Sequence, residues 1–527
     1  MSERLGRSAG LIGLATLTSR VLGMVRNIAQ AAFFATGQTA DAFVVATRLP
    51  TLLRDLFAEG AMSAAFVPTF TRHLTLNGKP AAWRLGSHVI NALLVVTGVI
   101  VLIGIAFAGP LARFYAEGYS DTPEKLALTT SLARINMPFL MLVSVAAACM
   151  GMLNALRRFF IPAASPALYN VAFILCLVIL VPLLRHFGMD DAIALSAGML
   201  IGGVAQIVAQ WPTLRREGYR HSWELDFRDP ALREILVLMA PGTIGAAAAQ
   251  VNLLVNTWLA TNVDHAASGL TYAFQLMYMP IGIIGVSLAT AAIPNLARHA
   301  AEGAHDQMRT TLSWGIRLML MLSVPATVGL MVLARPIVEM IYEHGRFTAL
   351  DTTIVSESLL FYAPGILGYS IVKIASPSFY SLQDARTPLM VSVIAIVTNL
   401  VLNLSLFPLM SYRGLALGTA IAANLNAGLL LFLLSRRIGG VDARRLATSF
   451  VKILIASAIM AVAVYWTEAW LAGHLPVRLL RSITLARVLR VSLAIGAGVG
   501  TLALAAWAMR MEEFQRAVSQ IGRRLRS

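Results

Sequence analysis

Residues 86–109 read GSHVINALLVVTGVIVLIGIAFAG, a run of 24 residues without Asp, Glu, Lys or Arg. A helix needs about 20 residues to cross the ~30 Å hydrocarbon core of a bilayer, so this run is long enough to span a membrane. The whole chain has the same character, because 57% of its 527 residues are hydrophobic and only 13% are charged. Soluble domains carry about 25% charged residues, so the composition excludes a soluble protein and predicts an all-α polytopic membrane protein.

Similar apolar runs recur along the chain, and we expect about fourteen transmembrane helices. Several runs contain Gly, Pro or a charged residue, so some of these helices are expected to bend or break. The predicted spans are 9–34, 41–70, 86–109, 127–154, 162–183, 191–212, 235–260, 267–295, 312–333, 353–379, 388–408, 414–435, 448–471 and 491–509.

Lys and Arg are distributed unevenly over the loops. If the N-terminus is cytoplasmic, the cytoplasmic segments hold 24 Lys and Arg and the external segments hold 10. Cytoplasmic loops of membrane proteins carry this excess of positive charge, so both termini are predicted to be cytoplasmic. Eight basic residues fall inside spans; two of these, Arg317 and Lys452, lie near helix ends, where long side chains reach the membrane surface.

The prolines reveal an internal repeat, because five of them recur at an offset of 226 residues. AAFVPTFTRH at 64–73 also matches TAAIPNLARH at 290–299. Each repeat has six helices, an even number, so both copies enter the membrane from the same side. This arrangement is typical of transporters built from two parallel lobes. The proline pairs are Pro68 and Pro294, Pro110 and Pro336, Pro138 and Pro364, Pro162 and Pro388, and Pro182 and Pro408.

The repeat predicts two pseudo-symmetric six-helix lobes followed by two extra helices. We place the N-lobe at 1–220, the C-lobe at 221–440, the two extra transmembrane helices at 441–509 and a basic amphipathic cytoplasmic tail at 510–527. The tail residues Arg523, Arg524 and Arg526 suit an anionic inner leaflet.

Charged residues are concentrated in the first two predicted spans. The stretch TSRVLGMVRNIAQAAFFATGQTADAFVVATRLPTLLRDLFAEG at 18–60 carries four arginines and three acids. A charge at mid-membrane costs about 2.5–3.5 kcal/mol, so these side chains must be paired or face water. The arginines are Arg20, Arg26, Arg48 and Arg54, and the acids are Asp41, Asp55 and Glu59.

Two interpretations of this stretch stay open. The acids can form structural salt bridges with the arginines, above all Arg54 with Asp55 and Glu59, although three acids cannot neutralise four arginines. Alternatively, the surplus guanidinium groups line a wet cavity, to which Arg134 and Lys373 add positive charge with Glu357 as a partner. Guanidinium groups bind phosphate oxygens in pairs, so such a cavity favours a diphosphate-bearing anion. Arg20 and Arg26 can share one face only if the first helix is irregular, which Gly23 would permit, and we expect Pro50 to kink the second helix.

The chain resembles the MurJ (MviN) family of lipid II flippases, within the multidrug/oligosaccharidyl-lipid/polysaccharide exporter superfamily. The resemblance rests on three runs: SRVLGMVRNIAQAAFFATGQTADAFVVATRLPTLLRDLFAEGAMSAAFVPTF at 19–70, YAFQLMYMPIGIIGVSLATAAIPNLARH at 272–299 and VKIASPSFYSLQDARTP at 372–388. It implies a cationic cavity between two lobes, a groove for a polyprenyl tail beside the last two helices, and alternating access.

Carried onto this sequence, the resemblance implicates six residues in substrate binding: Ser19, Arg20, Arg26, Asp41, Arg54 and Glu59. Family members commonly have an arginine where this chain has Gln275, and we expect Arg48 or Lys373 to compensate. Some members also resemble sodium-coupled transporters with aspartates in the seventh and eleventh helices. This chain instead offers a weak candidate Na⁺ site without a carboxylate, made of Asn256, Asn399, Asn403 and Thr419.

The resemblance implies a flippase that moves the undecaprenyl-diphosphate-linked peptidoglycan precursor, lipid II, across the bacterial inner membrane. The implied partners are lipid II, membrane lipids and proteins of cell-wall synthesis or division, with no nucleic acid. Alternatives are a flippase for another lipid-linked oligosaccharide or a drug/cation antiporter of the same superfamily. An enzyme is disfavoured, because the external segment 472–490 has no Asp or Glu, and no motif indicates a cofactor or nucleotide.

Overall fold

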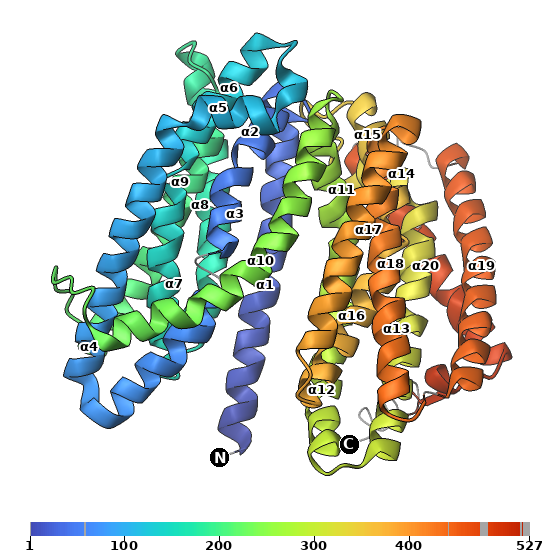
Figure 1. Ribbon diagram of the computed structural model, residues 1–527. Coiled ribbons are helices and arrows are strands. Elements are labelled where there is room, and N and C mark those ends of the chain that lie inside the picture. Colours follow the sequence, from blue (N-terminus) through green and yellow to red (C-terminus); the bar gives the residue numbers. More distant parts are fainter. Residues whose placement is uncertain (1, 57–59, 441, 475–482, 517–518, 520–527) are drawn as a thin grey trace. The chain divides into compact units, whose positions relative to one another are not determined.

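The structure, a computed structural model, describes residues 2–56, 60–440, 442–474, 483–516 and 519, and every regular element in these ranges is a helix (Figure 1). The helices form two compact units, which we describe separately. Unit 1 comprises Met1–Ser268 with Gly345–Phe347, and unit 2 comprises Gly269–His344 with Thr348–Ser527. The predicted all-α membrane fold is confirmed, whereas the segment boundaries at 220, 440 and 509 stay a prediction.

Unit 1 contains the first repeat and the helix that follows it. Its elements are α1 (Ser2–Phe34), α2 (Gln38–Ala46), α3 (Arg48–Arg54), α4 (Gly60–Ala106), α5 (Ala108–Tyr115), η2 (Glu117–Tyr119), α6 (Pro123–Asn136), α7 (Phe139–Ala155), α8 (Phe160–His186), α9 (Ile193–Arg216) and α10 (Pro230–Thr261).

Unit 2 contains the rest of the second repeat and the two extra helices. Its elements are most of α11 (Ala266–Pro280), η3 (Ile281–Gly285), α12 (Val286–Ala301), α13 (His305–Val332), α14 (Ala334–Ile341), α15 (Ala349–Tyr362), α16 (Gly365–Ser381), α17 (Arg386–Met410), α18 (Tyr412–Arg437), α19 (Ala443–His474) and α20 (Ile483–Ala508).

The helix boundaries confirm the internal duplication. When α5, α6 and α7 are shifted by 226 residues, both ends of each coincide with those of α14, α15 and α16. Pro110 and Pro336 are each the third residue of a short helix, and Pro138 and Pro364 each immediately precede a long one. Proline has no N–H and its ring clashes with the carbonyl four residues earlier, which explains why both copies break here. In the second repeat the two helices meet at a bend of 47°.

The second predicted span, 41–70, is divided among α2, α3 and the start of α4. The break between α2 and α3 falls at Thr47, three residues before Pro50. Proline lacks an N–H and clashes with the carbonyl four residues earlier, here that of Ala46, the last residue of α2. The predicted kink is therefore confirmed. Further on, α4 changes direction at Gly78, whose φ of 75° suits a residue without a side chain.

The number of spans is smaller when judged by length and apolar character. Within the described residues, ten helices are long and apolar enough to cross a membrane, or eleven if the bent pair α15 and α16 is one span. The predicted spans 9–34, 41–70 and 235–260 are not among them. Two of these three contain the charged stretch discussed above, which lowers their hydropathy. The count of fourteen stays a prediction.

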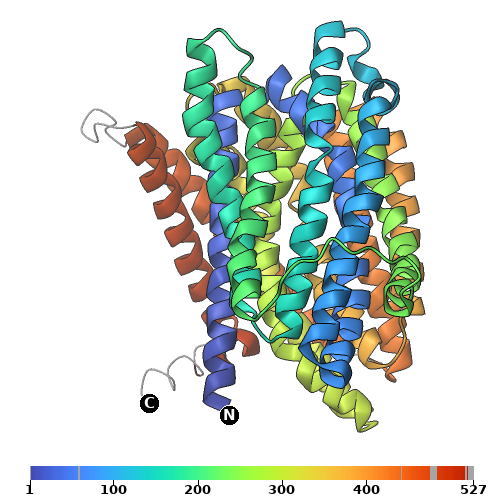
Figure 2. The same cartoon turned by 90° about the vertical axis from the view of Figure 1, so that its left-hand side faces the viewer.

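Small residues allow close contact between α8 and α9, and α1 packs along α8 (Figure 2). A methyl group added at Gly202 would lie 2.6 Å from the ring of Tyr169, and one added at Gly198 would lie 3.2 Å from the ring of Phe173. Membrane helices pack through such small residues because lipid supplies no hydrophobic drive between them. The glycines thus determine where the Tyr169 and Phe173 rings lie, and these rings form part of the candidate site.

Candidate functional site

The first helix carries two arginines on different sides. α1 is a continuous helix from Ser2 to Phe34, so the irregularity that Gly23 would permit is absent. Six residues separate Arg20 from Arg26, which is about 240° around a helix. Arg20 is exposed and Arg26 is half-buried. Gly23 lies beside α8, where the Asn170 side-chain amide donates to the Ser19 carbonyl over 3.1 Å.

Arg26 is held against α8 by aromatic rings. Its guanidinium carbon lies 5.7 Å from the ring centroid of Tyr169 and 5.5 Å from that of Phe173. Its Nη2 donates to Oδ1 of Asn27 over 3.1 Å. These cation–π contacts orient the group and leave its charge unneutralised. Among the residues that the structure describes, no carboxylate pairs with Arg20 or Arg26.

The other two arginines lie at the two ends of α3. Arg48, the first residue of this helix, is half-buried. Arg54, the last, donates from Nε and Nη2 to Oδ1 of Asp55 over 3.0 and 2.7 Å. The second Asp55 oxygen accepts from Nε2 of Gln250 on α10 over 3.2 Å. The predicted structural pair of Arg54 with Asp55 is therefore confirmed, and Glu59 lies outside the described residues.

Asp41 is completely buried and does not pair with an arginine. Its carboxylate accepts from Nζ of Lys125 (3.0 Å) and from the backbone N–H groups of His265 (3.0 Å) and Ser268 (2.9 Å). The Ser268 hydroxyl donates to it over 2.6 Å. Lys125 also contacts Asp264 and lies 4.2 Å from the centre of the Tyr119 ring. These contacts give Asp41 a structural role in joining α2 to α6 and to the start of α11.

The sequence does not reveal the roles of Lys125 and the aromatic rings. Lys125 lies in the segment 110–126, which is predicted to be an external loop, yet it is only 2% exposed. The sequence offers one signal of this burial. Lys125 is the third residue of a helix that begins at Pro123, and a side chain there can face a neighbouring element as readily as solvent. Tyr169 and Phe173, four residues apart on α8, form one face of that helix. Their spacing marks a face but does not indicate which cation it meets.

The remaining predicted binding residues belong to unit 2. Gln275 is half-buried on α11, beside an aromatic cluster in which Phe274 stacks on Tyr278 at 5.9 Å. Lys373 is half-buried on α16, and its Cγ lies 3.6 Å from the position of a methyl group added at Gly285. The predicted Glu357 partner of Lys373 is wrong. Glu357 accepts instead from Tyr412 and Arg413, over 2.5 and 2.8 Å.

Three of the four candidate Na⁺ ligands meet in unit 2. The Asn399 and Asn403 side chains exchange hydrogen bonds of 3.4 and 3.2 Å between their amide groups. Asn399 also donates to the Thr419 hydroxyl over 3.4 Å, which joins α17 to α18. Asn256 belongs to α10 in unit 1. In the described ranges, no three His, Cys, Asp or Glu side chains form a group able to hold a metal ion.

These features define a class of protein: a multi-pass helical membrane protein built from two homologous repeats, with unneutralised guanidinium groups on its first helix. Residues 30–484 match the family model described as "Lipid II flippase MurJ". The chain belongs to the MurJ family.

Curated relatives agree with this assignment. A protein of Rhizobium meliloti (strain 1021), named probable lipid II flippase MurJ, is 35% identical over 471 residues, which cover 88% of this chain and 86% of the relative. A protein of the same name from Vibrio cholerae serotype O1 is 33% identical over 475 residues, covering 88% and 90% of the two chains.

Solved structures show the same fold. One, titled lipid II flippase MurJ in an inward closed conformation, matches with a TM-score of 0.77 and 25% identity, covering 95% of this chain and 99% of that one. An inward-facing multidrug resistance transporter of the MATE family matches with a TM-score of 0.67 over 80% of this chain and 94% of its own. At 14% identity, this second likeness shows the fold alone.

Proposed function

We propose that this protein flips lipid II, the polyprenyl-diphosphate-linked precursor of peptidoglycan, from the inner to the outer leaflet of the bacterial cytoplasmic membrane. Membership of the MurJ family supports this proposal, as do curated relatives named lipid II flippases over most of their length. The observation that carries it is Arg26, whose charged group rests on two rings with no carboxylate beside it in the described part of the chain.

The chemistry of that group suits a diphosphate. A guanidinium presents parallel N–H donors that match two phosphate oxygens, and a charge left unneutralised by the protein gains most from an anionic ligand. In the proposed site, Arg20, Arg26 and Arg48 contact the headgroup, and Ser19 shares this surface. Gln275 and Lys373, in the second repeat, stay predicted binding residues.

Two of the implicated residues have other roles in this proposal, and a third is placed by the family pattern alone. Arg54 is already paired with Asp55, so it supplies less charge to the substrate. Asp41 positions the elements around it, since its oxygens are occupied by protein donors. Glu59 is assigned a part in the headgroup site on its match to the family pattern alone.

The proposed cycle contains no chemical step. The two repeats alternate in opening to either side of the membrane, and the arginines bind the headgroup on one side and release it on the other. Because binding must be reversible, a few charge-assisted hydrogen bonds suit this task better than a tight cage. The polyprenyl tail stays in lipid beside the two extra helices. We place both termini in the cytoplasm, on the excess of Lys and Arg in the segments on that side.

Depletion of the protein in cells tests this function directly. The leaflet that holds lipid II is then measured with an impermeant probe that modifies only precursor exposed on the outer surface. We expect the exposed fraction to fall while total lipid II rises. Normal exposure after depletion, in a strain with no second flippase, would contradict the proposal.

A further inference from the structure

Equivalent stretches of the two repeats each bind a chain segment that lies outside the six-helix repeat. The stretch in unit 1 is SHVIN at 87–91, in the second half of α4. The equivalent stretch in unit 2 is SWGIR at 313–317, in α13. The Asn91 side chain donates to the carbonyls of Ser222 and Glu224 over 2.8 and 2.7 Å, and His88 contacts Asp229 at 2.9 Å. The connection between the repeats is therefore attached to this stretch.

In unit 2, the equivalent stretch binds the segment that follows α20. Arg317, which occupies the position of Asn91, donates to Glu512 over 2.8 Å and to Glu513. The guanidinium of Arg516 lies 4.7 Å from the centre of the ring of Trp314, which occupies the position of His88. Arg317 is 7% exposed, and its position relative to the membrane surface stays a prediction.

The attachment at this end extends to α19. Glu513 is 2% exposed and accepts from the hydroxyl of Ser449 on α19 over 2.8 Å. Lys452, also on α19, donates to the carbonyl of Met509 over 3.0 Å. The hydrogen bond from Arg317 lowers the pKa of Glu512, which keeps this carboxylate charged. We call the contacts of Arg317, Glu512, Glu513, Ser449 and Lys452 the tail clamp.

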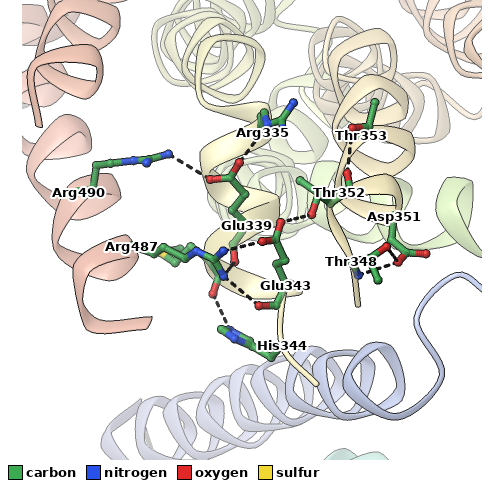
Figure 3. Close-up of polar contacts among 12 residues, drawn as sticks. Arg335, Glu339, Glu343, His344, Thr348, Asp351, Thr352, Thr353, Arg487 and Arg490 are labelled. Carbon is green, nitrogen blue, oxygen red and sulfur yellow. Dashed lines mark hydrogen bonds and ion pairs between the residues drawn. The ribbon is translucent and has the colours of Figure 1, made fainter. Parts of the chain in front are cut away.

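A second set of ion pairs lies where α19 ends and α20 begins (Figure 3). Arg487 on α20 donates from Nη2 to Glu343 over 2.5 Å and from Nη1 to the Glu343 carbonyl over 2.9 Å. Arg490 contacts Glu339 on α14 at 3.2 Å and Glu468 on α19 at 3.0 Å. We call this group the α14 clamp. All five side chains are less than a quarter exposed, so water screens their attraction only in part.

Between the two clamps, α19 and α20 pack on the second repeat through apolar residues. Met460, Val464 and Ala494 form a buried cluster with Leu333, the residue that joins α13 to α14. A methyl group added at Gly498 of α20 would lie 2.6 Å from Val464, so the two helices are in close contact. The pair α19 and α20 is thus attached to α13 and α14 at both ends and in the middle.

We propose that the tail clamp and the α14 clamp fix α19 and α20 to the second repeat, so that these helices move with α13 and α14 as one body throughout the transport cycle. Arg317, Glu343 and Arg487 are then positioning residues for transport: they keep the two extra helices, beside which the polyprenyl tail is proposed to lie, in register with the moving repeat. The inference rests on the proposed function for its transport readout. It concerns attachment within unit 2.

A reversible cross-link tests whether the α14 clamp stays closed during transport. Glu343→Cys and Arg487→Cys are combined in a chain whose buried Cys149 and Cys176 are replaced by alanine, then joined by a short bifunctional methanethiosulfonate. In vesicles containing lipid II, we expect the cross-linked protein to retain its flipping rate within about twofold. A loss of tenfold or more that a reductant reverses would overturn the inference. Each single-cysteine variant treated with the same reagent is the control.

The tail clamp has a test that needs no substrate. In Arg317→Ala, the segment after α20 loses its main ion pairs, so trypsin should cleave after Arg510 or Arg516 at least tenfold faster, since cleavage reports the population of the open form. Arg317→Lys should restore much of the protection. Arg309→Ala, at the exposed start of the same helix, is the matched control.

These two tests separate the inference from the proposed function. If the chain with only Cys149 and Cys176 replaced, in which both clamps are intact, moves no lipid II, the proposed function fails, and the tail-clamp proteolysis still decides the attachment. If trypsin cleaves Arg317→Ala no faster than Arg309→Ala, the attachment is refuted whatever the substrate is.

Discussion

At the residue scale, the surroundings of a charged side chain determine its role. Arg54 and Arg26 are both half-buried arginines near the start of the chain. Arg54 is neutralised by the next residue, Asp55, whereas Arg26 rests on aromatic rings. Sequence spacing suggested the first arrangement, because the partner is adjacent. It did not predict the second, because Tyr169 and Phe173 are more than 140 positions away.

Removal of the unneutralised arginines should abolish transport without loss of protein. We expect Arg20→Ala and Arg26→Ala each to fail to support growth in a depletion strain while membrane levels of the protein stay near normal. The reason is that neither guanidinium forms a structural ion pair with a described residue. Arg216→Ala, at an exposed position at the end of α9, should grow normally. Low protein levels in the two test variants would instead indicate a structural role.

The two acids that contact Lys125 should differ sharply in their effect on stability. Each lies 3.0 Å from Nζ, but the Asp41 side chain is fully buried and that of Asp264 is 79% exposed. Breaking a buried ion pair costs about 3–5 kcal/mol, so Asp41→Asn should lower the melting temperature in detergent markedly. Asp264→Asn should cost about 0–1 kcal/mol. Equal effects of the two substitutions would refute the structural role of Asp41.

At the element scale, prolines and glycines determine where helices break and how closely they pack. Pro50 predicted the division of the second span, because its missing N–H and its ring act on the residue four positions earlier. Gly23 did not break α1, since a single glycine inside a helix costs only about 1 kcal/mol relative to alanine. Glycine alone therefore does not distinguish a break from a close contact.

A methyl group at Gly202 should disturb both packing and the candidate site. Gly202→Ala forces the ring of Tyr169 to shift, because the added carbon would lie 2.6 Å from it, and such overpacking costs about 1–3 kcal/mol. Since Arg26 rests on that ring, we also expect reduced transport. Gly500→Ala is the control, because nothing lies within 4 Å of the added carbon. It should be neutral or slightly stabilising.

At the scale of the whole molecule, the duplication organises the chain. Residues 87–91 on α4 and 313–317 on α13 are equivalent in the two repeats. The first stretch binds the connection between the repeats, whereas the second binds the segment after α20. The asymmetry lies in the charges: Asn91 donates to backbone carbonyls, whereas Arg317 requires carboxylates. Each segment supplies the matching acceptors.

The predicted orientation in the membrane can be tested by cysteine labelling. In a chain without Cys149 and Cys176, an impermeant maleimide should label Ser120→Cys in intact spheroplasts, because the 110–126 segment is predicted to be external. It should label His305→Cys only after permeabilisation, since 296–311 is predicted to be cytoplasmic. Both positions are exposed, so accessibility within the protein does not limit the reaction. The reverse pattern would contradict the proposed topology.

The sequence by itself determined the membrane class, the duplication and the concentration of arginines in the first helices. These properties follow from composition and periodicity, which each segment carries independently of its neighbours. Only the tertiary structure decided the partner of each charge: Lys125 for Asp41, two rings for Arg26, and Glu512 and Glu513 for Arg317. Such pairs join residues far apart in the chain, and their attraction depends on distances and burial that exist only after the helices have packed.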